Sequence, residues 1–302
     1  MSSHDALMVA SGITTVLDAV AIGDVRDGGD RLENLEKMIN AVEETQKRGL
    51  NRAEHRLHLR CELPHHTTLP LFEKLVGREP VSLVSLMDHS PGQRQFANIE
   101  KYREYYKGKY ALNDAEMARY EEEQLQLAAR WSQPNRLSIA AMCRDRNIAL
   151  ASHDDATHDH VRESHQLGSV IAEFPTTFEA AEASRKHGMN VLMGAPNIVR
   201  GGSHSGNVAA SKLASLGLLD ILSSDYYPAS LLDAAFRVAD DEGNRFTLPQ
   251  AIRLVTKNPA SALNLHDRGE IAEGKRADLV LAHRKGEHVH IDHVWRQGKR
   301  VF

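Results

Sequence analysis

The side chains best suited to chemistry in this sequence are imidazoles and carboxylates at the ends of short apolar segments. The chain has 17 histidines, and histidine is both the commonest metal ligand and a common acid–base group near neutral pH. Such groups end or follow five apolar segments: Glu62, Asp88 with His89, His153 with Asp154 and Asp155, Glu173, and Asp225. Carboxylates gathered in a partly buried site repel one another, and a divalent cation neutralises them. The pattern predicts a metal centre of imidazole and carboxylate ligands, which suits Zn²⁺, Mn²⁺, Fe²⁺ or Ni²⁺.

A second candidate is the glycine- and serine-rich segment at residues 200–207. Adjacent glycines let the backbone approach a ligand closely, and hydroxyls, exposed N–H groups and arginine suit phosphate oxygens. The residues predicted to bind phosphate are Arg200, Gly201, Gly202, Ser203, His204, Ser205 and Asn207, together with Arg94 from an earlier loop. Alone, such a segment is usually an ordinary turn, and its place near a metal centre is what favours phosphate.

Seven short apolar segments would position these groups. They span residues 14–19, 56–62, 81–87, 148–152, 170–174, 190–194 and 220–224, with helical patterns between them at 31–48, 69–77, 116–131, 178–188 and 208–216. Continuous apolar runs are typical of strands buried on both faces of a parallel sheet. The alternation predicts a TIM-type (β/α) barrel, whose catalytic groups lie at the carboxyl ends of the strands. A closed barrel needs eight strands, so we expect the first strand to lie outside this chain.

The rest of the chain completes the expected organisation. Residues 5–11 favour a helix closed by Gly12. Residues 96–131 are a charged, tyrosine-rich insertion, either a solvated helical segment or a lid over the barrel mouth. Residues 247–263 favour one helix, and 278–282, 288–291 and 293–295 favour three short strands. We therefore predict a barrel domain at residues 1–263 and the remnant of a small β domain at 264–302.

Composition excludes several classes of protein. The net charge is −4 and no long block of lysine or arginine occurs, which argues against a general nucleic-acid binder. No apolar segment approaches the ~20 residues of a membrane span, and the first residues lack the pattern of a signal peptide. Cys61 and Cys143 are too few for a disulfide framework or a cysteine zinc site. We expect a cytoplasmic enzyme of a small phosphorylated substrate, without nucleic-acid or membrane partners and with homo-oligomerisation left open.

Several motifs resemble a known family. Residues 255–260 (VTKNPA), 268–271 (RGEI) and 274–280 (GKRADLV) are similar to the C-terminal signature of the amidohydrolase superfamily. More narrowly, residues 12–18 (GITTVLD), 88–96 (DHSPGQRQF), 173–177 (EFPTT) with 194–207 (GAPNIVRGGSHSGN), and 222–232 (LSSDYYPASLL) resemble the phosphonate-metabolism diphosphatases of the carbon–phosphorus lyase pathway. The resemblance spans the whole chain.

The resemblance implies hydrolysis of α-D-ribose 1-methylphosphonate 5-triphosphate to the 5-phosphate and pyrophosphate, with a metal-activated hydroxide attacking the α-phosphorus. It implies a divalent metal, zinc by first choice, with Glu62, His153 and Asp225 as ligands and His89 as a further ligand or a phosphate contact. Glu62 would be the carboxylate able to bridge two ions, and Asp225 would also transfer the catalytic proton. Glu173 stands where many relatives have histidine.

The resemblance also implies a departure at the front of the chain. Relatives begin with a strand carrying a His-x-His metal motif, which has no match here. We therefore expect either a truncated chain, which we favour, or a strand supplied by another subunit. In the truncated case two ligands are missing, and the chain would hold metal weakly and turn over slowly or not at all.

Two other functions stay open at this stage. The chain could be a different amidohydrolase that opens a cyclic amide or deaminates a base, although Arg94, Arg200 and the serine–glycine segment favour a polyanionic substrate. It could also be a truncated, inactive chain with a structural role only.

Several reactive side chains are expected to have no catalytic role. We expect His55, His58 and His66 on strand or loop surfaces. Cys61 precedes Glu62 and should face the opposite side of its strand, towards the core. The histidines expected in the C-terminal region, away from the barrel mouth, are His283, His288, His290 and His293.

Overall fold

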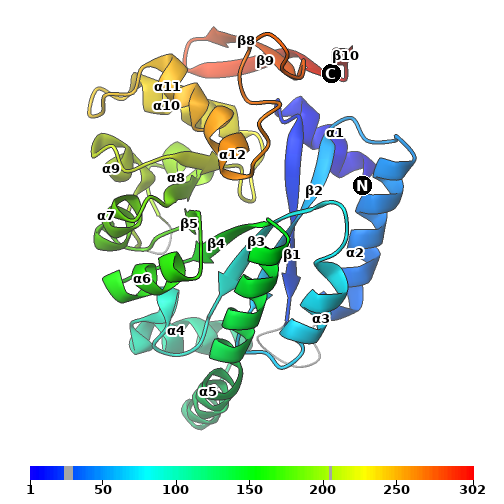
Figure 1. Ribbon diagram of the computed structural model, residues 1–302. Helices are drawn as coiled ribbons and strands as arrows, with labels where there is room; N and C mark the ends of the chain where they lie inside the picture. The colour runs from blue at the N-terminus through cyan, green and yellow to red at the C-terminus, as the bar shows by residue number, and fades with distance from the viewer. Residues whose placement is uncertain (24–29, 204–205) are drawn as a thin grey trace.

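Seven parallel strands form one curled sheet with helices on its outer face (Figure 1). The computed structural model describes residues 1–23, 30–203 and 206–302, with the backbone alone at 30–33. The strands lie in sequence order: β1 (Thr15–Ile22), β2 (Glu54–Glu62), β3 (Val81–Met87), β4 (Ala149–His153), β5 (Ile171–Glu173), β6 (Asn190–Gly194) and β7 (Ile221–Ser223). Within the described ranges β1 and β7 are not paired. The seven predicted strands are therefore confirmed, and they form a barrel that is open between its first and last strand.

Helices precede, connect and follow the strands, and most of them cover the outer face of the sheet. Their bounds are α1 (Ser2–Ala10), α2 (Asp30–Lys47), α3 (Thr68–Leu75), α4 (Ile99–Tyr110), α5 (Asp114–Asp145), α6 (His158–Gln166), α7 (Phe178–Lys186), α8 (Ala195–Arg200), α9 (Ala210–Ser215) and α10 (Ser230–Asp240). One predicted helix, at 116–131, was too short, because α5 begins at a capping box formed by Asn113 and Glu116 and continues through Pro134. Gly12 follows α1 with a φ of 78°, the left-handed conformation expected just beyond a helix end.

The two faces of β2 differ in chemistry. Leu57, Leu59 and Cys61 are fully buried in the largest apolar cluster, between the sheet and the helices outside it. The alternate side chains, among them His58 and Glu62, face the other way because successive residues of a strand point to opposite faces. The expected core position of Cys61 is confirmed. The barrel interior is therefore polar along β2.

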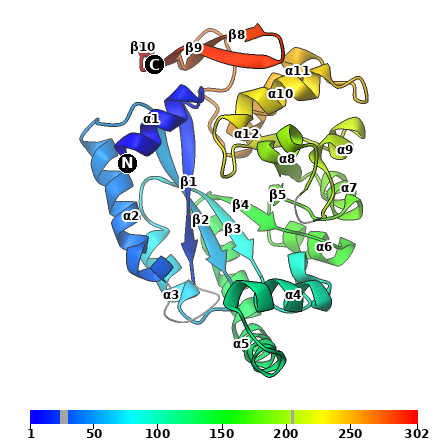
Figure 2. The same cartoon turned by 180° about the vertical axis from the view of Figure 1, so that it is seen from behind.

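The tyrosine-rich insertion has an apolar cluster of its own. Phe96, Tyr102, Tyr106 and Tyr120 are buried against one another between α4 and α5. Both helices lie at the end of the molecule towards which the arrow of β1 points (Figures 1 and 2). The insertion is therefore a packed helical pair beside the carboxyl ends of the first strands.

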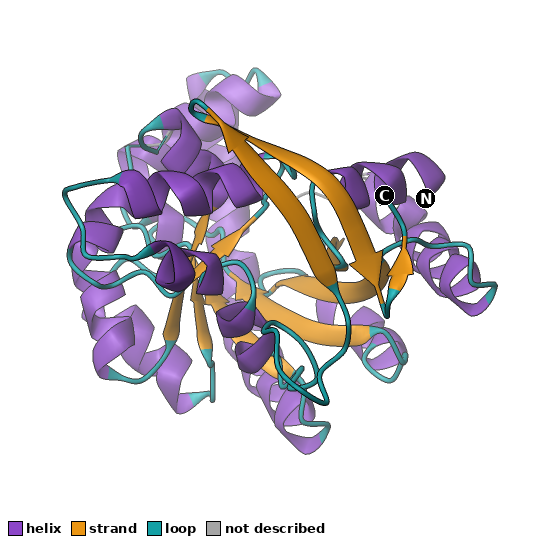
Figure 3. Cartoon of the chain, turned by 90° about the horizontal axis from the view of Figure 1, so that it is seen from above, coloured by secondary structure: helices purple, strands orange, loops and turns teal. Residues whose placement is uncertain are grey.

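The C-terminal region forms a separate antiparallel sheet of β8 (Leu279–Lys285), β9 (His288–Arg296) and β10 (Lys299–Arg300). Seen from above, β8 and β9 cross over the amino ends of the barrel strands (Figure 3). Two expectations were wrong in detail. Residues 288–295 belong to one strand, and the pairing register with β8 shifts at Asp292, which has no paired residue on β8. The helix expected at 247–263 is divided into α11 (Leu248–Arg253) and α12 (Lys257–Ala262), because Thr256 leaves the helical conformation. In the described part of the chain no helix has the length and apolar character needed to cross a membrane.

Candidate functional site

Four predicted or adjacent site residues meet at the carboxyl ends of β2, β3 and β4. Glu62 is the last residue of β2, and its carboxylate accepts hydrogen bonds from the His89 backbone N–H (3.1 Å) and from His89 Nδ1 (2.6 Å). On the other side of the ring, His89 Nε2 lies 3.9 Å from Asp154 Oδ2. His153, the last residue of β4, has its Nδ1 2.9 Å from the same oxygen. The carboxylates and imidazoles therefore alternate in a row, in the order Glu62, His89, Asp154 and His153.

The donor set of this cluster fits a divalent metal ion. His89, His153 and Asp154 each offer one ligand atom, and these atoms lie within 4.8 Å of one another. His153 Nδ1 is buried and, despite its closeness to Asp154, makes no hydrogen bond of acceptable geometry in the described structure. Two imidazoles and one carboxylate suit Zn²⁺ and similar transition metals. Glu62 hydrogen-bonds to the other ring nitrogen of His89, the place that a supporting carboxylate takes in metal sites. Its predicted role as a metal ligand stays a prediction.

The electrostatics of the cluster favour bound positive charge. Burial disfavours protonation of His89, yet the charge of Glu62 and its hydrogen bond, with Asp154, raise the pKa of His89 above its ordinary value. The guanidinium of Arg60 donates from Nη2 to His153 Nε2 at 2.6 Å. A cationic group therefore already lies against this acidic cluster, as expected where carboxylates are held together.

Behind the cluster, a buried network of hydrogen bonds fills the barrel interior. His58 Nε2 donates to Ser85 Oγ (2.5 Å), which donates to Glu173 Oε2 (2.6 Å). Burial opposes ionisation of Glu173, but its electrostatic interactions with the neighbouring imidazoles and Arg60, and the hydrogen bond from Ser85, lower its pKa. Burial also lowers the pKa of His58 to about 4. Glu173 therefore supports the site from within.

Two histidines are not where the sequence placed them. His55 and His58 are 0% and 6% exposed, so the expectation of surface positions was wrong for both. His58 lies on the polar inner face of β2, and His55 lies on the outer face beneath α1. Only His66 of that group is exposed. The position of β2 in a parallel sheet could have indicated that both histidines are buried, because such a strand is covered on both faces.

Asp154 is the residue that sequence reasoning left out of the ligand set. Strand alternation would point it away from His153, but its φ of 57° lies in the left-handed region. Phe174 and Asp225, which follow β5 and β7, adopt the same conformation, with φ of 57° and 50°. Such backbone conformations in non-glycine residues are uncommon and gather at functional sites. The turn after β4 therefore brings Asp154 back beside His153.

Asp225 is not one of the residues that form this cluster. It is exposed, and neither group of potential metal ligands found among the described residues includes it. Its carboxylate lies over the end of β6, since a Cβ built on Gly194 would be 3.0 Å from Asp225 Oδ2. Its predicted roles as ligand and proton carrier stay predictions.

Arg94, predicted to contact phosphate, is buried in a network of ion pairs. It is 5% exposed and pairs with Asp155 and, at 2.6 Å, with Glu163. Arg136 of α5 extends the network, pairing with Glu163 at 3.0 Å and with Asp88 at 3.1 Å. In this arrangement Arg94 ties together the loops after β3 and β4, and a phosphate contact by it stays a prediction.

The glycine- and serine-rich segment follows α8 at the same end of the sheet. Arg200 donates to the Tyr226 hydroxyl at 2.8 Å and to the Gly202 carbonyl at 3.4 Å. Gly201 and Gly202 have φ of 83° and 158°, which only glycine adopts readily. Ser203 and Asn207 are half-buried, while the predicted contacts His204 and Ser205 lie outside the described residues. The segment thus holds an exposed guanidinium near Asp225 and its neighbour Tyr226.

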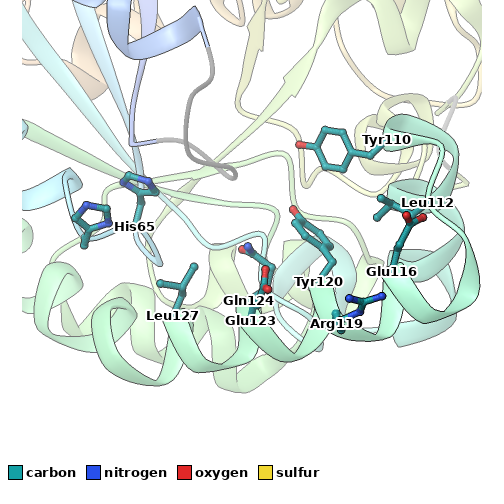
Figure 4. A pocket seen from close by; sticks show the side chains of 10 residues that line it. His65, Tyr110, Leu112, Glu116, Arg119, Tyr120, Glu123, Gln124 and Leu127 are labelled. Atoms are coloured by element: carbon teal, nitrogen blue, oxygen red, sulfur yellow. The ribbon is translucent and has the colours of Figure 1, made fainter.

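Two cavities adjoin the insertion. The one beside the cluster has a volume of about 630 Å³, and its lining includes Glu62, His89, Arg60, Phe96 and Lys109. The second, of about 450 Å³, lies between the loop after β2 and the helices α4 and α5, where Figure 4 shows its lining side chains. No predicted site residue lines the second cavity. The first is the candidate substrate pocket, and sequence reasoning missed its lysine.

The comparisons with known proteins agree with this geometry. The model of the amidohydrolase family matches residues 6–302. The chain is 90% identical over all 302 of its residues to alpha-D-ribose 1-methylphosphonate 5-triphosphate diphosphatase of Escherichia coli, of which it covers 80%.

Solved structures share the fold at much lower identity. A dihydropyrimidinase from Brevibacillus agri has a TM-score of 0.54 at 11% identity and matches 98% of this chain and 78% of its own. An adenosine deaminase from Xanthomonas campestris with bound zinc has a TM-score of 0.53 at 15% identity, over 98% of this chain and 68% of its own. These likenesses concern the fold, whereas the family match extends from the first helix to the last residue. The chain belongs to the amidohydrolase family.

Proposed function

We propose that this protein is a metal-dependent diphosphatase that hydrolyses α-D-ribose 1-methylphosphonate 5-triphosphate to the 5-phosphate and pyrophosphate. The observation that carries the proposal is the 90% identity, over the whole chain, to the enzyme of that name. The cluster at the strand ends and the adjoining cavity supply the matching chemistry. The two free, buried cysteines, Cys61 and Cys143, accord with a cytoplasmic enzyme.

His89, His153 and Asp154 would hold the metal ion, with zinc as the first choice. Glu62 would orient His89 through its two hydrogen bonds and keep the imidazole aligned. When bound, the metal would activate water and neutralise charge on phosphoryl oxygens. Glu173 and Ser85 would hold the His153 side of the centre in place, through the buried network behind it.

Two exposed cations would bind the polyphosphate. Lys109 lines the same cavity as Glu62 and His89, and its Nζ lies 5.4 to 5.6 Å from the ring centres of Tyr105, Tyr106 and Tyr110. The three rings hold the ammonium group by cation–π attraction without neutralising it, so its charge remains for an anion. Arg200 would add a second contact from the opposite part of the rim.

The test measures the release of pyrophosphate from the ribose triphosphate. Phosphorus NMR monitors the reaction with and without chelator. Activity should disappear with chelator and return with zinc. Asp154→Asn should lower kcat/KM on the order of 100-fold, whereas Asp159→Asn, an exposed carboxylate on α6, should leave it unchanged. Lys109→Gln should raise KM about 10-fold, the loss of roughly 1.4 kcal/mol of binding, with little change in kcat.

One result would reject the proposed activity, and another would reject the proposed metal centre. One is hydrolysis of a cyclic amide or deamination of a base in place of triphosphate turnover, which would favour another amidohydrolase activity. The other, full triphosphate turnover by the Asp154→Asn protein, would leave the diphosphatase activity standing and reject the assignment of the metal to this cluster.

A further inference from the structure

A second cluster of potential metal ligands lies on the other side of the sheet from the candidate centre, beneath α1. His4 of α1, Asp18 of β1 and His55 of β2 each offer a ligand atom, and these atoms lie within 4.8 Å of one another. His55 stands near the beginning of β2 and Glu62 at its end, a separation of roughly 23 Å along an extended strand. The cluster is therefore distinct from the site described above.

Both carboxylate oxygens of Asp18 face an imidazole nitrogen. Its Oδ1 lies 2.7 Å from His4 Nε2, and its Oδ2 lies 2.7 Å from His55 Nδ1. An imidazole lone pair cannot face a carboxylate oxygen at this distance, because the two would repel each other. Each contact is a hydrogen bond when the nitrogen carries a proton. A bound metal ion would displace these protons and take the nitrogens and the Asp18 carboxylate as neighbouring ligands.

The far side of the His55 ring has the support that metal-binding histidines usually have. His55 Nε2 lies 3.2 Å from Asp5 Oδ1, and Asp5 is itself fixed by the backbone N–H groups of Arg52 and Ala53, both at 2.9 Å. A carboxylate on one ring nitrogen fixes the tautomer and leaves the other nitrogen, here Nδ1, for a metal. Arg52 also pairs with Asp5 at 3.6 Å, so Asp18 is the carboxylate left for the ion.

We infer that His4, Asp18 and His55 form a structural Zn²⁺ site, with Asp5 as the supporting carboxylate of His55. Two imidazoles and one carboxylate match the ligands that zinc takes. The His4 and Asp18 side chains are 44% and 14% exposed, so the ion can enter from solvent and keep one water. The ion would join α1 to the first two strands, at the end of the barrel where groups serve stability rather than catalysis. The inference is independent of the proposed function.

Zinc bound per chain provides the test, measured by elemental analysis of the whole chain after chelator treatment, reconstitution with zinc and desalting. The variants are His4→Gln and Asp18→Asn, with His266→Gln as an exposed control outside both clusters. His153→Gln removes a ligand of the candidate catalytic centre. We expect His4→Gln and Asp18→Asn each to bind one zinc fewer than the wild type and the control, while His153→Gln retains this ion.

A stability measurement tests the structural role. Zinc should raise the melting temperature of His153→Gln on the order of 5 °C, and should leave the His4→Gln/His153→Gln double variant unchanged. If circular dichroism shows that Asp18→Asn does not fold, His4→Gln decides alone, since it alters an exposed side chain. Unchanged zinc content in a folded His4→Gln or Asp18→Asn protein overturns the inference, and so does an equal zinc-dependent shift in the double variant. Loss of hydrolysis in His153→Gln bears on the proposed function only.

Discussion

Glu54, at the start of β2, should make folding stability depend on pH in a predictable way. It accepts hydrogen bonds from Arg268 at 2.9 Å and Arg56 at 2.7 Å, and also from Arg276. Burial opposes its ionisation, but the Arg276 hydrogen bond and the arginine charges outweigh burial and lower the pKa of Glu54 from 4.5 to about 2. At 1.36 kcal/mol per pH unit, this ionised carboxylate stabilises the fold by about 3 kcal/mol at neutral pH.

The sign follows from the lowered pKa. The contribution is complete above pH 4.5, where the unfolded chain is ionised, and is lost as the pH falls towards 2. By pH 3, about 2 kcal/mol of it should be gone. Glu54→Gln should therefore be less stable than the wild type at pH 7, and the gap should narrow by about 2 kcal/mol at pH 3, because protonated glutamate resembles glutamine.

Urea unfolding of both proteins between pH 7 and pH 3 measures this gap. Glu287→Gln, at an exposed glutamate in the turn between β8 and β9, serves as the matched control and should follow the wild type throughout. A gap between wild type and Glu54→Gln that stays constant over the whole range would refute the reasoning, since it would mean that the pKa of Glu54 is not lowered by folding.

Two further substitutions, the first with a matched control, test packing and buried charge. Gly269→Ala should lower the unfolding free energy by more than about 2 kcal/mol in urea titrations, because an added Cβ would lie 2.8 Å from the Lys257 Cα and the φ is 87°. Gly274→Ala, with a φ of 78° but open space around it, should lose only about 1 kcal/mol, and equal losses would contradict the steric part of the argument. Arg136→Met should cost about 3–5 kcal/mol in the same assay, because it leaves the buried Asp88 carboxylate unpaired; a loss below about 1 kcal/mol would show that the pair is solvated.

Much of the fold was predictable because its strands are buried on both faces. Their apolar runs needed no knowledge of distant contacts, and the predicted strands match the structure to within a few residues. The errors occur where a local signal was misleading. Pro134 lies inside α5, which is held by packing of Ile139 and Cys143 against the sheet. Asp292 interrupts an apolar pattern but lies at a register shift in a continuous strand.

The site was less predictable because it depends on backbone turns and on contacts between distant segments. Glu62, His89 and His153 could be placed at one edge, since parallel strands end together. Asp154 lies beside His153 because its backbone is in the left-handed conformation. The sequence alone does not predict this conformation at an aspartate. The place of Lys109 in the cavity beside Glu62 depends on how α4 packs beside the sheet. No pattern in the sequence indicates how the insertion packs against the strands. Arg94 has the type expected of a phosphate contact, yet the carboxylates around it lie 61 and 69 residues further along the chain.

The structure gives the two ends of β2 different tasks. At its beginning, Glu54 faces the barrel side and pairs with Arg268 and Arg276 of the C-terminal signature. These ion pairs hold the signature segment against β2, so the motif has a structural role. At its end, Glu62 aligns an imidazole of the candidate metal centre. The segment between them is fixed by the apolar residues Leu57, Leu59 and Cys61 on the outer face. A change at Glu54 should therefore alter stability with little effect on kcat in the folded fraction, whereas Glu62→Gln should reduce kcat and metal affinity while the protein unfolds at nearly the same urea concentration. Equal effects of both substitutions on both measurements would mean that β2 does not separate these tasks.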